Sequence, residues 1–189
     1  MQNFPSQLFV IDLHHNKLQG PIPGFREKSL YLDFSSNKFN SVIPRDIGNY
    51  LSLTFFFSLS NHTLSGSIPD SLCNASNLQV LDLSNNNISG TIPSCLVATN
   101  ENLRVLNLRK NNLMGPVPDA FPAASTLVTL DLNDNKLYGK IPKSLSNCTS
   151  LQVLDLGNNN IKDVFPCLLK NISTLRVSVL RENNLYGHI

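Results

Sequence analysis

Apolar and polar residues alternate in short segments that recur along the chain. In the segment LRVLNLRKN, Leu106 and Leu108 are two residues apart, and the polar residues Asn107 and Arg109 follow them. Residues two apart in a β-strand share one face, so the two leucines lie on one side of a short, half-buried strand. One such strand is unable to bury its own leucines. The pattern therefore predicts strands whose apolar side is covered by other copies of the same segment.

The segment recurs eight times in the pattern LxxLxLxxNxLxGxIP. Strong copies begin at Leu8, Leu78, Leu103 and Leu127, weaker copies begin at Ser29, Thr54 and Leu151, and an incomplete copy begins at Leu175. The asparagine position is filled by Asn16, Asn37, His62, Asn86, Asn111, Asn135, Asn159 and Asn183. Successive positions are 21, 25, 24, 25, 24, 24 and 24 residues apart. The spacing predicts one continuous repeat array over residues 1–189, with no domain boundary.

The repeat predicts an α/β fold, namely a right-handed solenoid. Its strands pair in a parallel concave β-sheet, and short helical or irregular segments return the chain along the convex side. The asparagine after each strand has an amide that both donates and accepts, so we expect it to satisfy backbone groups of the turn. The glycine four residues later permits a positive φ, and the proline of xIP holds the chain extended.

Composition and charge argue against several classes of partner. The chain has 31 Leu and 25 Asn, and its net charge of +2 comes from 15 bases and 13 acids without a basic or acidic block. Nothing therefore indicates binding to nucleic acid or to an anionic membrane. No apolar run approaches the roughly 18 residues of a membrane span, and the start MQNFPSQLFV lacks the regions of a signal peptide. We expect no membrane contact by this segment itself.

The sequence contains no recognisable catalytic, metal or cofactor motif. The histidines are His14, His15, His62 and His188, and their spacing matches no metal-ligand motif. We interpret His62 as a substitute for the turn asparagine. GxSxG, Walker and GxGxxG sequences are absent, so we predict neither an enzyme nor a cofactor.

Aspartates recur between the two inward residues of the strands and form a predicted column on the concave face. They are Asp12, Asp33, Asp82, Asp131 and Asp155. Stacked carboxylates about 4.8 Å apart resemble an acid/base or cation site. Recurrence in five repeats favours a structural role instead, in which each carboxylate accepts hydrogen bonds from the neighbouring strand.

The concave face is the predicted place for function because its residues vary while the inward ones do not. Candidates for binding a ligand or partner are the residues that depart from the usual Ser, Asn and Asp: His14, Tyr31, Phe55, Phe56, Arg104, Arg109, Lys110, Arg176 and Arg181. Aromatic and basic side chains are common anchors of interfaces. For each single residue, a solvated sheet surface is the alternative interpretation.

The GxIP segment in a 24-residue period resembles the plant-specific class of extracellular leucine-rich repeat. The stretches LSGSIPDSLCNASNLQVLDLSNNNISGTIPSCL and NCTSLQVLDLGNNNIKDVFPCLLKNISTLRV further resemble the membrane-distal ectodomain of plant receptor-like proteins of the Verticillium-resistance and Cf type. That resemblance implies a receptor with extracellular repeats, one membrane span and no kinase, which perceives a pathogen or damage molecule and signals through a co-receptor kinase.

The resemblance implies a non-enzymatic segment that recognises a peptide, protein or glycan ligand, or docks a partner, at the extracellular face of the plasma membrane in defence signalling. The alternative is a soluble wall-resident inhibitor of a pathogen hydrolase, similar to polygalacturonase-inhibiting proteins. The family's cysteine-bearing cap, island, span and tail are missing. We therefore interpret residues 1–189 as a single solenoid fragment of eight plant-type repeats, with the last incomplete and no caps.

Five sequons predict N-glycosylation. Asn74, Asn147 and Asn171 each lie 12 residues before a turn asparagine or its equivalent, on the predicted convex return. Glycans there would cover the convex side and leave the concave side open. Asn61 and Asn87 flank the turn position and are less favourable acceptors.

The four cysteines contain no CxxC pair, and in a chain whose relatives are secreted we expect disulfides rather than thiol nucleophiles. Neighbouring repeats lie roughly 4.8 Å apart, within the roughly 4.4 to 6.8 Å between α-carbons that a disulfide allows. Only Cys73 with Cys95, and Cys148 with Cys167, join adjacent repeats. We predict these two bonds, with reduced thiols as the alternative.

Overall fold

A computed structural model describes residues 8–24, 29–123 and 125–188. The strands are β1 (Val10–Asp12), β2 (Gln19–Gly20), β3 (Tyr31–Asp33), β4 (Lys38–Phe39), β5 (Phe56–Ser58), β6 (Val80–Asp82), β7 (Ser89–Gly90), β8 (Val105–Asn107), β9 (Asn112–Pro116), β10 (Thr129–Asp131), β11 (Lys136–Gly139), β12 (Val153–Asp155), β13 (Asn160–Ile161) and β14 (Val177–Val179). The helices are the 3₁₀ helices η1 (Ile47–Tyr50), η2 (Asp70–Asn74), η3 (Lys143–Asn147) and η4 (Cys167–Asn171), and the α-helix α1 (Cys95–Ala98).

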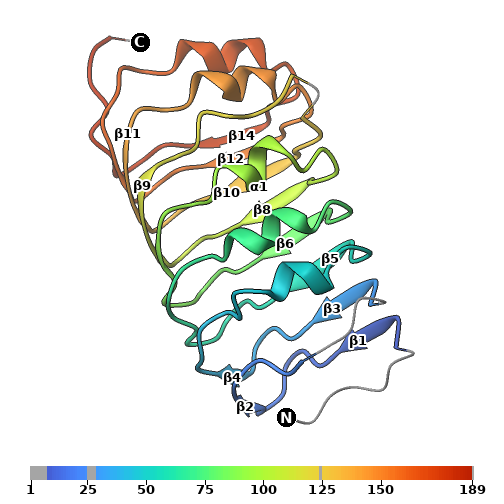
Figure 1. Cartoon of the computed structure of the whole chain (residues 1–189). Coiled ribbons are helices and arrows are strands. Elements are labelled where there is room, and N and C mark those ends of the chain that lie inside the picture. Colours follow the sequence, from blue (N-terminus) through green and yellow to red (C-terminus); the bar gives the residue numbers. More distant parts are fainter. Residues whose placement is uncertain (1–7, 25–28, 124, 189) are drawn as a thin grey trace.

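One strand from each repeat joins an eight-stranded parallel sheet in the order β1-β3-β5-β6-β8-β10-β12-β14. The repeats are in register, so Leu106 pairs with Leu81 on one side and with Leu130 on the other. Figure 1 shows the strands stacked along the molecule, with the short helices on the opposite side of the stack. The predicted α/β solenoid is confirmed.

A second sheet, which we did not predict, follows the turn of each repeat. The strands β13, β11, β9 and β7 form a four-stranded parallel sheet, and β2 pairs with β4. These strands lie where the sequence carries the NxLxGxIP segment, which we had interpreted only as a turn followed by extended chain. The six pattern glycines of the described residues, such as Gly90 and Gly115, have a positive φ as expected.

The core is a continuous column of apolar side chains between the first sheet and the helices. The middle residue of the strands is inward and buried, as Leu32, Leu81 and Leu130 illustrate with at most 1% exposure. Helix residues close the other side, among them Leu72 of η2 and Leu145 of η3. Each repeat thus buries its leucines only against its neighbours.

The turn asparagines satisfy backbone groups of two repeats, as predicted. The Nδ2 group of Asn135 donates to the carbonyls of Leu132, Asn133 and, in the preceding repeat, Leu108 at 3.0 Å. Its Oδ1 atom accepts the N–H of Leu113 at 3.0 Å. The same arrangement recurs at Asn37, Asn86, Asn111, Asn159 and Asn183.

The disulfide prediction is right for one pair and wrong for the other. Cys73 and Cys95 are bonded, with α-carbons 5.6 Å apart. Cys148 and Cys167 are free, Cys148 being buried and Cys167 exposed. The prediction compared only the number of repeats between cysteines. Cys73 and Cys95 are both half-buried. The side chain of Cys148 instead lies in the core, with its Sγ 3.5 Å from Ser125 Oγ, and Cys167 lies at the surface.

No helix in the described part of the chain is long and apolar enough to cross a membrane.

Candidate functional site

The concave face is the side of the eight-stranded sheet that points away from the core. Four columns of residues run across it, and each takes one residue from every repeat. The leading column directly precedes the strands: Phe9, Leu30, Phe55, Gln79, Arg104, Val128, Gln152 and Arg176. The central column holds the first strand residues: Val10, Tyr31, Phe56, Val80, Val105, Thr129, Val153 and Val177. The acidic column holds the third: Asp12, Asp33, Ser58, Asp82, Asn107, Asp131, Asp155 and Val179.

The fourth, trailing column lies two residues further along each repeat: His14, Ser35, Ser60, Ser84, Arg109, Asn133, Gly157 and Arg181. The inward residues between these columns are nearly all Leu, Ile or Phe, whereas the columns change chemistry from strand to strand. A face that varies on a constant scaffold is suited to specific recognition.

The three predicted aromatic residues come together at one end of the face. The rings of Tyr31 and Phe56 stack with centroids 4.4 Å apart and planes 9° apart. The ring of Phe55 lies 6.2 Å from that of Tyr31 and is 41% exposed. Adjacent strands in register bring these rings together, so the half-buried rings of Tyr31 and Phe56 and the exposed ring of Phe55 form an aromatic surface of the kind that anchors interfaces.

The five predicted basic residues do not form one cluster. Arg104 and Arg176 lie in the leading column, and Arg109 and Arg181 lie in the trailing column. Lys110 is not a sheet residue, because it occupies the turn with a φ of 53°. Every repeat has a left-handed residue at this position, directly before the turn asparagine.

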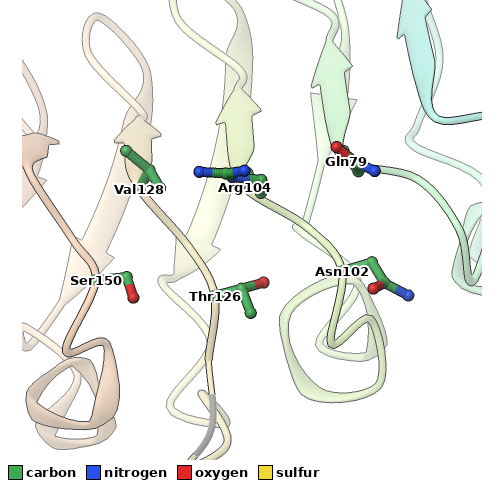
Figure 2. A pocket seen from close by; sticks show the side chains of 6 residues that line it. All are labelled: Gln79, Asn102, Arg104, Thr126, Val128 and Ser150. Atoms are coloured by element: carbon green, nitrogen blue, oxygen red, sulfur yellow. The ribbon is translucent and has the colours of Figure 1, made fainter.

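Arg104 lines a shallow pocket at the leading edge of the sheet (Figure 2). In Figure 2 its side chain lies between Gln79 and Val128, and Asn102, Thr126 and Ser150 form a second row on the loops before the strands. The Thr126 hydroxyl donates to the carbonyl of Glu101 at 2.6 Å, and the Asn102 amide donates to the carbonyl of Ser76 at 2.9 Å. These two groups are engaged within the solenoid, so the guanidinium of Arg104 is the group suited to an anionic ligand group.

The acidic column is structural along most of its length, but its hydrogen bonds differ in part from our prediction. The carboxylate of Asp33 accepts the N–H of Ser35 at 2.9 Å, two residues further on in its own repeat. Asp155 accepts such a bond from Gly157 and, as predicted, also one from the neighbouring repeat, where the Asn133 amide donates at 3.0 Å. Asn107 replaces an aspartate and accepts the N–H of Arg109 in the same way at 3.2 Å. Burial and the neighbouring Asp155 raise the pKa of Asp131, and Arg109 opposes that shift.

Asp12, His14 and Asp33 form a polar cluster beside the aromatic rings. Their ligand atoms lie within 4.8 Å of one another, and His14 Nδ1 is 2.6 Å from Asp12 Oδ1. The hydrogen bond to Asp12 raises the pKa of His14, and the same bond lowers the pKa of Asp12. Among the described residues, these three form the group whose side-chain atoms lie close enough together to share a metal ion. Sequence analysis placed Asp12 and Asp33 in one column and His14 on the concave face, but it did not group His14 with them because the two carboxylates come from different repeats.

The predicted glycan acceptors Asn74, Asn147 and Asn171 are the last residues of η2, η3 and η4. They lie on the helical side, across the stack from the concave face (Figure 1). Asn74 and Asn171 are exposed, whereas Asn147 is half-buried and its amide donates to the carbonyl of Phe121. Asn61 and Asn87 flank the turns and are exposed.

The repeated strand, turn asparagine and helical return define a leucine-rich-repeat solenoid. Sequence models of the leucine-rich repeat match residues 30–50, 76–121 and 101–161. The chain is similar to Receptor-like protein 31 of Arabidopsis thaliana, with 37% identity over 81 residues, which are 41% of this chain and 9% of that protein.

Solved structures with the same fold include plant receptor ectodomains. The Arabidopsis receptor kinase HAESA, in complex with the peptide hormone IDA and the co-receptor SERK1, superposes with a TM-score of 0.90 and 30% identity over 99% of this chain and 33% of that chain. The plant peptide hormone receptor RGFR1, in complex with RGF2, gives a TM-score of 0.79 and 25% identity over 100% of this chain and 35% of that chain. This chain therefore spans about a third of each ectodomain and a tenth of the receptor-like protein.

Proposed function

We propose that this chain is a recognition segment of a plant cell-surface receptor-like protein in defence signalling, which binds a peptide, protein or glycan ligand, or docks a partner, without catalysing a reaction. Its place is extracellular, and the complete receptor signals through a co-receptor kinase. The observation that carries the proposal is the concave face, where exposed aromatic and basic residues vary over a repeated core.

The relatives support the kind of ligand. HAESA is described with a peptide hormone and a co-receptor, and RGFR1 is described as a peptide hormone receptor. An extended peptide crosses several strands of a solenoid, so its affinity is the sum of contacts from several repeats. A peptide is therefore the first ligand class to test.

A concave variant exchanges face residues for those that neighbouring repeats carry in the same column, so the fold is preserved. It combines Tyr31→Val, Phe55→Gln, Arg104→Gln and Arg109→Ser. The control variant removes two charges on the helical side, Lys143→Ser and Lys170→Ser.

Immobilised chain is panned against displayed random 12-residue peptides, and retained peptides are measured by titration calorimetry. We expect the concave variant to bind at least about tenfold more weakly, which corresponds to about 1.4 kcal/mol, and the control variant to bind like the natural chain. Retained peptides whose affinity falls only in the control variant, or no retained peptide at all, would contradict recognition of a peptide by this face.

A further inference from the structure

An apolar patch covers the leading and central columns over the first three strands. It consists of Phe9, Val10, Leu30, Tyr31, Phe55 and Phe56. Phe9 and Val10 are 57% and 59% exposed, and Leu30 is 37% exposed. In later repeats the leading column is mostly polar, with Gln79, Arg104, Gln152 and Arg176. Phe9, Val10, Leu30 and Phe55 are thus exposed together at one end of the face, whereas at the other end Val177 is exposed beside Arg176. A contiguous apolar patch of this kind marks an interaction site.

Two carboxylates border this patch. Asp12 and Asp33 are paired in register and lie two residues beyond Val10 and Tyr31. The Tyr31 hydroxyl is 3.5 Å from Asp33 Oδ2, so the aromatic surface and the carboxylate meet. Within the described ranges, His14 is the one basic side chain that pairs with either carboxylate, and no lysine or arginine does so. The border therefore carries negative charge that a cationic ligand group would neutralise.

We propose that this end of the concave face binds an arginine-bearing segment of the peptide ligand, with the guanidinium on Asp12 and Asp33 and an adjacent apolar side chain on Tyr31, Phe55 and Phe56. The inference rests on the proposed function and names the ligand chemistry of that site. A guanidinium presents a planar fork of donors that suits two neighbouring carboxylates. The aliphatic stem of arginine packs on apolar surface while its head remains at the charged border.

The combination of features favours this ligand over a sugar or a metal ion. A neutral sugar would stack on the rings but bring no counter-charge to Asp33, and Asp12 would keep only His14 as its partner. A metal ion would use Asp12, His14 and Asp33 but make no use of the apolar patch. Arginine beside an apolar residue uses both surfaces, because it brings a positive charge and apolar area in one short segment.

Variants in which asparagine replaces the two border aspartates are expected to fold, because one repeat already has asparagine at this position. Asn107 stands in the acidic column and keeps the hydrogen bond to the backbone two residues on. Asp12→Asn with Asp33→Asn therefore removes charge and retains the turn. Asp155→Asn is the matched control in the same column, on β12 near the other end of the sheet.

The test uses the whole chain and the peptides that it retains from the random display library. We expect a majority of retained peptides to carry arginine next to an aromatic or aliphatic residue. Fluorescence anisotropy of one such peptide then gives a double-mutant cycle. Arginine to glutamine in the peptide should weaken binding to the natural chain and to Asp155→Asn about tenfold, and should change binding to the double aspartate variant less than twofold. Phe55→Ser should weaken binding about fivefold without lowering the melting temperature.

Three outcomes would overturn the inference. The first is that the retained peptides share acidic residues, and that their binding requires Arg104 or Arg109 but not Asp12 and Asp33. This result would refute the arginine ligand but leave the proposed function intact. Binding that 1 mM EDTA abolishes would assign the cluster to a metal ion. Retention of cellohexaose, lost in Phe55→Ser and unchanged in the double aspartate variant, would assign the patch to a sugar. Absence of any retained peptide would instead remove the proposed function itself.

Discussion

At the scale of single residues, the turn asparagine determines how one repeat is joined to the next. Its amide donates to carbonyls of two repeats and accepts an N–H of the preceding one, as Asn135 shows. His62 fills the same position less well. Its Nε2 lies 2.9 Å from the Phe34 carbonyl, and its buried Nδ1 has no hydrogen-bond partner. A buried polar atom without a partner costs stability.

We predict that His62→Asn stabilises the chain by roughly 1 kcal/mol, because asparagine supplies both the donors and the acceptor that the turn requires. Burial also lowers the pKa of His62 below its ordinary 6.5. The unfolded chain therefore binds this proton at a higher pH than the folded chain, and His62 reduces stability progressively as the pH falls through 6.5 and below.

Urea unfolding at pH 7.5 and pH 5.5 checks both statements. The stability gain of His62→Asn over the natural chain should be larger at pH 5.5. His14→Asn is the control, since His14 is exposed and its pKa is raised rather than lowered. A His62→Asn chain that is less stable than the natural one at both pH values would refute this account of the turn.

Residue patterns predicted the turn asparagines because one polar residue recurs after each apolar strand. They did not predict that the aspartates accept hydrogen bonds from their own repeat, since alternation shows only which face a side chain occupies. The left-handed residue before each asparagine was also missed. His15, Lys110 and Glu182 adopt this conformation although none is glycine. The stacked repeat imposes it, and residue identity gives a weak signal.

At the scale of elements, the first sheet was predictable and the second was not. Leucines two apart indicate a half-buried strand, whereas the strands of the second sheet are mostly 2 to 4 residues long with at most one buried position. Only β9, with 5 residues, has two buried positions in alternation, and one of them is Gly115. The disulfides, too, were predicted only in part. Counting repeats identified adjacent returns, but it did not show that the side chain of Cys148 is buried in the core while that of Cys167 is exposed.

Thiol labelling checks the corrected cysteine assignment. We predict that the native, oxidised chain reacts with dithionitrobenzoate at Cys167 and not at Cys148, because Cys148 is buried and burial raises its thiol pKa. Cys73→Ser with Cys95→Ser should lower the unfolding free energy by about 3 kcal/mol, on the scale of a loop near 20 residues. Protection of both Cys148 and Cys167 in the native chain, released only by reductant, would restore the second disulfide.

The helical returns pack closely at Gly48. A β-carbon added there would lie 1.8 Å from the carbonyl oxygen of Ser71 in η2, a backbone atom that has little room to move. We predict that Gly48→Ala lowers the unfolding free energy by about 2 to 3 kcal/mol, on the scale of overpacked positions. Arg45→Ala, on the exposed chain just before η1, should change it by less than about 0.5 kcal/mol in the same urea titration. Equal unfolding free energies of Gly48→Ala and Arg45→Ala would contradict close packing between Gly48 and the backbone of Ser71.

At the scale of the whole molecule, the two sides of the stack differ in chemistry. The helical side carries the sequons at the ends of η2, η3 and η4, and the concave side carries the exposed aromatic and basic residues. Sequence alone predicted this division and several face residues, including Tyr31 and Phe56. It missed Phe9 and Leu30, and it interpreted Asp12 and Asp33 as structural, because their importance lies in the neighbours that stacking brings beside them.

Peptide mapping of the chain expressed in plant cells tests the division. We predict glycans at Asn74 and Asn171, which are exposed, and a lower occupancy at Asn147, whose amide is half-buried. Glycans found chiefly at Asn61 and Asn87, with the three return sites unmodified, would contradict the account.

Hydroxyl-radical footprinting with a bound peptide tests recognition by the concave face most directly, because the chain contains its own control residues. Tyr31 and Phe55 lie on the concave face, whereas Met114, Tyr138 and Tyr186 lie along the second sheet and are 46%, 54% and 56% exposed. We predict that a peptide retained by the chain slows oxidation of Tyr31 and Phe55 and leaves oxidation of the other three residues unchanged. Protection of Met114, Tyr138 and Tyr186, with Tyr31 and Phe55 oxidised as in the free chain, would contradict it.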